Sequence, residues 1–110
     1  MIINLFPAGT IAPPTPPTPE SLGSWSISVT DSWFNYYTVS VTFTPYTQFV
    51  SSGINWNISC QDLTPYSSTP GDVEAKVTYD FGANPSGSIL NLTATRADGA
   101  YTENYDYTIP

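Results

Sequence analysis

The sequence has no histidine, a single cysteine (Cys60), and two basic residues against nine acidic ones in 110 residues. Without histidine it holds neither a His-based triad nor a His-ligated metal site, and one cysteine makes no internal disulfide or zinc cluster. The net charge of −7 disfavours nucleic acid, because neutralising phosphates needs clustered Lys or Arg. The composition therefore predicts no enzyme, no cofactor and no nucleic-acid partner.

Long apolar runs are also missing. No stretch approaches the roughly 18 apolar residues of a membrane span, so we expect no membrane association. Residues 2–8 are apolar, but no Lys or Arg precedes them and Asn4 and Pro7 interrupt the run, which makes a poor signal peptide. We therefore expect synthesis in a host cytoplasm. Only 10% of residues are charged, whereas 28 are Ser or Thr, a composition typical of a protein exposed outside the cell.

Proline is concentrated in an N-terminal arm. Residues 1–19 carry no charged side chain and hold six of the eleven prolines. The Pro/Thr-rich segment 13–21 is predicted to be an extended spacer, in which seven polyproline II residues span roughly 20 Å. Residues 1–12 precede it as an apolar anchor peptide that we expect to bind a scaffold protein. Its anchoring side chains are Ile2, Ile3, Leu5 and Phe6.

From residue 22 onward apolar and polar residues alternate with a period of two, which predicts half-buried strands. The apolar series begin at Trp25, Tyr37, Ile54, Val73, Leu90 and Tyr101. Six or seven short antiparallel strands in about 90 residues predict an all-β fold, an immunoglobulin-like (Ig-like) antiparallel β-sandwich over residues 22–110. Its predicted core includes Trp25, Val29, Val41, Phe43, Trp56, Ile58, Val77, Leu92 and Tyr105.

Turn residues separate the predicted strands. The turns are expected at Asp31-Ser32, Pro45, Ser51-Ser52-Gly53, Pro70-Gly71, Asn84-Pro85-Ser86-Gly87 and Asp98-Gly99. Asp98-Gly99 gives the clearest signal of a tight hairpin. The sequons Asn57-Ile58-Ser59 and Asn91-Leu92-Thr93 fall inside predicted strands, so we interpret them as sheet residues.

Carboxylates are the only plentiful reactive groups. Most lie in turns or on outward strand positions, which does not favour the facing pair that a glycosidase needs. No EF-hand spacing occurs, and a calcium site assembled from separate loops stays open. Cys60 follows Ile58 in the inward register, and we interpret it as a small buried apolar residue.

Aromatic residues in predicted loops are the candidate ligand-binding groups. They are Trp33, Tyr36, Tyr46 and Tyr66. Exposed aromatic rings stack on sugar rings, and we expect the loops that carry these four residues to lie at the end of the sandwich opposite the arm. The stretch from Trp25 to Cys60, with its Trp33-Phe34 turn and Gly53-Ile54-Asn55-Trp56, resembles β-sandwich modules that bind cellulose or chitin. That resemblance implies glycans as ligands, and the net charge of −7 leaves neutral glycans or protein surfaces as the expected partners.

The whole layout resembles head-decoration and head-fibre proteins of tailed bacteriophages. An apolar anchor, a Pro/Thr spacer and an Ig-like domain carry this likeness. It implies a non-enzymatic protein on the virion surface, bound through residues 1–12 to the capsid and able to act as an oligomer on the particle. Two alternatives stay open: a carbohydrate-binding module of a secreted polysaccharide-degrading system, and an extracellular filament subunit whose arm completes a neighbour's sheet.

Overall fold

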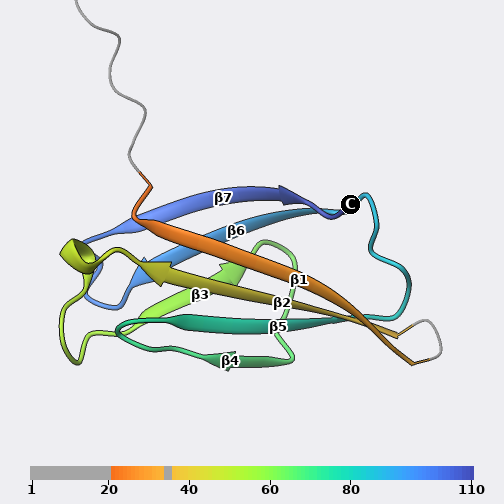
Figure 1. Ribbon diagram of the computed structural model, residues 1–110, viewed down its shortest axis with the longest axis horizontal. Helices are drawn as coiled ribbons and strands as arrows, with labels where there is room; N and C mark the ends of the chain where they lie inside the picture. The colour runs from red at the N-terminus through yellow and green to blue at the C-terminus, as the bar shows by residue number, and fades with distance from the viewer. Residues whose placement is uncertain (1–20, 34–35) are drawn as a thin grey trace, which may run out of the picture.

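The computed structural model describes residues 21–33 and 36–110, which form an all-β domain (Figure 1). The predicted anchor residues Ile2, Ile3, Leu5 and Phe6 lie outside the described residues. The described elements are β1 (Gly23–Trp33), β2 (Tyr36–Pro45), a short 3-10 helix η1 (Thr47–Phe49), β3 (Trp56–Cys60), β4 (Ser67–Thr69), β5 (Ala75–Phe81), β6 (Ile89–Arg96) and β7 (Thr102–Thr108).

The strands pair in two antiparallel sheets. Sheet A has the order β1-β2-β5-β4 and sheet B the order β3-β6-β7. In a constant-type immunoglobulin domain the first, second, fifth and fourth strands form one sheet, and the third, sixth and seventh form the other. The observed order is the same, so the predicted Ig-like sandwich is confirmed. β1 begins near one end of the domain, which we call the arm end because the arm precedes β1 in the sequence, and the carboxyl terminus lies toward the opposite end (Figure 1).

Trp56 is the centre of the core, as the sequence predicts. It is fully buried on β3, the strand on which immunoglobulin domains carry their core tryptophan. No cysteine pair joins the two sheets; instead the ring of Phe43 packs against Trp56 with centroids 5.1 Å apart. Buried residues from both sheets complete the core, among them Val39, Val41, Ile58, Cys60, Val77, Tyr79, Leu90, Leu92 and Ile109.

The Asp98-Gly99 hairpin is also confirmed. Arg96 N–H donates to the Tyr101 carbonyl at 3.1 Å, and Gly99 N–H donates to the Arg96 carbonyl at 2.8 Å. Gly99 has φ +76°, a left-handed conformation that glycine adopts without the steric cost of a Cβ. The turn therefore joins β6 to β7 as its sequence predicts.

The first hairpin differs from the prediction. Asp31-Ser32 is not a turn, because β1 continues through both residues to Trp33 and pairs Asp31 with Tyr37. The register shifts between Asp31 and Trp33, so a β-bulge accommodates the irregular end of the ladder. Polar turn formers are tolerated there because this end of β1 is an exposed edge.

Two further strand boundaries are corrected. The alternation predicts a strand that begins at Val73, but β5 starts at Ala75 and Val73 is largely exposed in the preceding loop. Ile54 likewise precedes β3, which starts at Trp56. The short β4 consists of three polar residues, all of them exposed. It has no alternation of apolar and polar residues, so the sequence pattern does not predict it.

Three residues of the predicted core, all on the side where β1 faces β7, are only partly buried. Val29 and Tyr105 are 38% and 37% exposed, and Trp25 is only partly buried against the core. All three have the inward register, but β1 and β7 each lie at an edge of their sheet, on the same side of the sandwich. No further strand covers that side, so these side chains stay partly exposed, whereas the inward residues of β3, which is also an edge strand, are buried.

Candidate functional site

A carboxylate on β7 binds Ser21 and Leu22, the two residues that precede β1, which we call the arm root. Glu103 lies on β7 in the same register as Tyr105, and accepts bonds from Leu22 N–H and Trp25 Nε1–H, each at 2.5 Å. The Ser21 hydroxyl lies 3.2 Å from Glu103 Oε1, and also 2.6 Å from the Gly23 carbonyl. The segment where the arm meets β1 is therefore held against the edge of sheet B.

Glu103 is an exception among the carboxylates, most of which are expected in turns or on outward strand positions. Its side chain points toward β1 and is half-buried. The sequence does hold a signal for it: Glu103 is the one charged residue in the inward series that runs from Tyr101 to Tyr107. A charge at such a position needs compensating hydrogen-bond donors, and the segment entering β1 supplies them.

The three predicted ligand-binding tyrosines do not all come together, and the side chain of Trp33 lies outside the part of the chain that the structure describes. Tyr46 follows β2, and its N–H donates to the Leu22 carbonyl at 2.9 Å, which places it at the arm end of the domain. Tyr36 lies at the start of β2, ten residues away along an extended strand, and pairs with Trp33. The prediction that all these loops share the end opposite the arm is therefore wrong for Tyr46.

Tyr36 and Tyr66 do lie near each other at the end opposite the arm, with Asp80 beside them. The Tyr36 hydroxyl lies 3.4 Å from Asp80 Oδ2, and the Thr38 hydroxyl lies 3.4 Å from Asp80 Oδ1. Asp80 raises the pKa of Tyr36, chiefly because its negative charge opposes a second one nearby. Tyr66 is 74% exposed and stays a candidate stacking surface.

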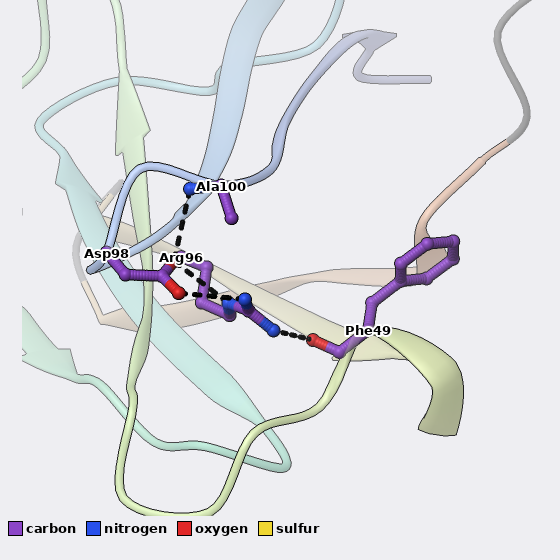
Figure 2. A network of polar contacts seen from close by, with 4 residues as sticks. All are labelled: Phe49, Arg96, Asp98 and Ala100. Atoms are coloured by element: carbon purple, nitrogen blue, oxygen red, sulfur yellow. Dashed lines mark hydrogen bonds and ion pairs between the residues drawn. The ribbon is translucent and has the colours of Figure 1, made fainter.

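At the arm end, Arg96 ties two loops together (Figure 2). Its guanidinium donates from Nε and Nη2 to the two carboxylate oxygens of Asp98, at 2.9 and 2.8 Å, and from Nη1 to the Phe49 carbonyl at 3.1 Å. The Arg96 guanidinium also lies 4.8 Å from the centre of the Tyr101 ring. The hydrogen bonds from Arg96 lower the pKa of Asp98, and the Ala100 N–H bond adds to this effect.

The outward face of sheet B holds a depression of about 460 Å³. Its polar lining is two cross-strand rows of three residues, each with one residue from β6, one from β7, and one from β3 or the position directly after it. The rows are Ser59–Thr93–Asn104 and Gln61–Asn91–Asp106. We call these six residues the polar array. Sequence alternation predicts that its strand members point outward, but not that the register aligns them in rows.

The outward face of sheet A has a different chemistry. In β1 and β2 its outward positions are almost entirely Ser and Thr, from Ser24 to Thr30 and from Thr38 to Thr44. Hydroxyl groups rotate freely, whereas amide and carboxylate groups present donors and acceptors in fixed planes. The array on sheet B is therefore better suited to selecting a ligand.

Two groups that could carry out chemistry are buried, and burial disfavours their ionised forms. Burial raises the pKa of the Cys60 thiol and raises the pKa of Tyr79 to about 12. Within residues 21–33 and 36–110, no three His, Cys, Asp or Glu side chains are placed to hold a metal ion. In the same residues, no helix is long and apolar enough to cross a membrane.

Comparison with known proteins gives no relative for this chain: no family model, no curated protein and no solved structure matches it. Its candidate sites are therefore interpreted from their own geometry.

Proposed function

We propose that this chain is a non-enzymatic virion-surface protein, a capsid decoration or head-fibre protein. Residues 1–12 anchor it to the capsid, and the Ig-like domain is exposed to bind neutral glycans on the host surface. The observation that carries this proposal is the attachment of the arm root to β7 by Glu103. The Glu103 side chain on β7 binds the segment before β1. A pulling force on the arm would therefore be resisted by β7 of sheet B as well as by β1 of sheet A.

The arm is chemically suited to anchoring. Its apolar side chains, Ile2, Ile3, Leu5 and Phe6, each contribute on the order of 1.5–3 kcal/mol when buried in a groove, before ordering costs. The spacer then separates the domain from the scaffold. Several weakly held copies on one particle gain further from multivalency.

The domain is chemically suited to exposure. Both basic side chains of the chain are engaged by acidic neighbours, Lys76 with Glu74 at 3.5 Å and Arg96 with Asp98 at 2.8 Å. The domain therefore presents little attraction to nucleic acid or to anionic lipid. Its outer sheet faces offer hydroxyl and amide groups, which are suited to neutral, hydroxyl-bearing partners.

The experiment is co-sedimentation of the tagged chain with particles from the producing host, in a density gradient. The full-length chain is expected in the particle band. A variant with Ile2, Ile3, Leu5 and Phe6 changed to Ser is expected to stay folded by circular dichroism and to leave that band. The matched control, Thr15→Ala with Thr18→Ala, alters the spacer without touching the anchor and is expected to remain bound.

Two results would overturn parts of the proposal. If the full-length chain is absent from purified particles, the protein is not a virion component. If the Ser-substituted variant stays at full occupancy, residues 1–12 are not the anchor.

A further inference from the structure

We propose that the polar array on sheet B is a binding site for neutral glycans, and that it, rather than the loop tyrosines, carries the recognition. This inference rests on the proposed function, since it names the surface that the displayed domain would use. It follows from the depression, the alignment of its six polar side chains, and the bonds that hold four of them.

The alignment places three polar side chains side by side in each row. Ser59 is the register partner of Thr93, which is the partner of Asn104, and Asn91 is the partner of Asp106. Gln61 joins the second row because its N–H donates to the Asn91 carbonyl at 3.1 Å. Neighbours lie about 4.8 Å apart across the strands and about 6.8 Å apart along them. A single sugar ring therefore spans two or three members of the array.

Two hydrogen bonds fix the orientation of the array. Asn91 Nδ2 donates to Asp106 Oδ1 at 2.8 Å, and the Thr93 hydroxyl donates to Asn104 Oδ1 at 3.0 Å. These bonds leave Asn104 Nδ2 to donate, and Asn91 Oδ1 and Asp106 Oδ2 to accept. Donors and acceptors held in place before binding reduce the ordering cost that a weak ligand must overcome.

The chemistry of the array selects a neutral, hydroxyl-rich ligand. Each sugar hydroxyl both donates and accepts, so it matches a surface that offers both kinds of group. Asp106 is the one charged member of the array, and it disfavours anionic sugars. No basic side chain offsets it, because Arg96 is bound to Asp98 and Lys76 lies on sheet A.

An exposed apolar residue borders the array. Ile89 is 63% exposed on β6, on the same face as Asn91 and two residues before it. It can contact the apolar face of a sugar ring. Because the lining has no aromatic side chain for stacking, we expect millimolar affinity at each site, which many copies on one particle would raise.

The test is an NMR titration of the ¹⁵N-labelled full-length chain. The probes are the methyl glycosides of glucose, galactose, mannose and N-acetylglucosamine, each added to about 100 mM, a concentration suited to millimolar sites. At least one probe is expected to shift the side-chain amide signals of Gln61, Asn91 and Asn104. If no probe shifts them, or if shifts occur only around Tyr36 and Tyr66, the array is not the site.

Matched variants locate the binding. Asn104→Ala is expected to weaken binding about fivefold, as for the loss of one hydrogen bond. Asn57→Ala removes an exposed Asn from the same face of sheet B, outside the array, and is expected to leave affinity unchanged. Equal losses in the two variants, or none in Asn104→Ala, would overturn the assignment.

The particle assay separates this inference from the proposed function. Asn104→Ala is expected to remain in the particle band, because it leaves the anchor intact. A domain that fails to bind any probe but still depends on residues 1–12 for particle association would refute the array alone. If the full-length chain itself is absent from the particle band, the proposed function is refuted, whereas the result of the NMR titration is unaffected.

Discussion

The interior around Trp56 and the side where β1 faces β7 share one alternating pattern but differ in how they are held together. Trp56 is fully buried between the sheets, with Phe43 and other apolar side chains around it. Trp25, at the β1–β7 side, stacks on Tyr105 with centroids 5.4 Å apart and donates to Glu103. The centre is therefore stabilised by burial, and the β1–β7 side depends partly on polar bonds.

The largest effect is expected from Trp56→Ala. It leaves a cavity between the sheets and should lower the free energy of unfolding by about 3–5 kcal/mol. Thr42→Ala, on the outward face of β2, is the control and should cost less than about 1 kcal/mol. Urea denaturation followed by circular dichroism measures both. Similar losses in the two variants would mean that the centre contributes no more than the surface.

Glu103→Gln tests the polar attachment at the β1–β7 side. The amide replaces one accepting oxygen with a donor, so at least one of the bonds from Leu22 N–H and Trp25 Nε1–H is lost. We expect a loss of about 1.5–3 kcal/mol, as for a hydrogen bond to a charged group. The Trp25 indole N–H signal should shift and exchange faster with solvent.

The control for this variant is Glu74→Gln, which removes an exposed carboxylate paired only with Lys76. Its effect on stability should be close to zero, because exposed ion pairs contribute little. A Glu103→Gln protein as stable as the Glu74→Gln protein would show that apolar contacts alone hold the β1–β7 side.

One substitution made at two positions compares the two regions directly. Val77→Thr places a hydroxyl in the buried centre and should cost about 1–2 kcal/mol. Val29→Thr makes the same change at a residue that is 38% exposed and should cost less than about 0.5 kcal/mol. The difference between the two midpoints of urea unfolding measures how much more strongly the buried centre disfavours a hydroxyl group than the β1–β7 side does. No difference would contradict the comparison.

These two valines also show how far the sequence predicts the fold. Alternation assigns both to the inward side, and that assignment places the strands and Trp56 correctly. It does not predict how deeply each side chain is buried, because burial depends on how the two sheets lie against each other, which alternation along one strand does not record. It also misses the β1 extension past Asp31-Ser32, where an exposed edge tolerates residues that usually form turns.

The candidate site is predictable only in part, for a related reason. The inward position of Glu103 among tyrosines is a readable signal in the sequence. The rows Ser59–Thr93–Asn104 and Gln61–Asn91–Asp106 are not, since they depend on the register of β3, β6 and β7. A shift of one residue would turn every member of a strand to the other face.

The smallest effect is expected at a second polar attachment, where Arg96 links the β6–β7 hairpin to Phe49. The bonds from Arg96 hold the folded-state pKa of Asp98 below its ordinary value near 3.8. The ionised carboxylate therefore stabilises the fold above that pH, and this contribution is lost as the pH falls through the folded pKa. Asp98→Asn removes it at every pH.

The native protein should therefore be more stable than the Asp98→Asn variant at pH 7, and the two should converge as the pH falls from about 5 toward 2. Urea midpoints across this range, followed by tryptophan fluorescence, measure the convergence. The control is Asp62→Asn, which changes an exposed carboxylate with no ion pair among the described residues. A constant gap between the native and Asp98→Asn proteins would mean that the ion pair does not stabilise the arm end.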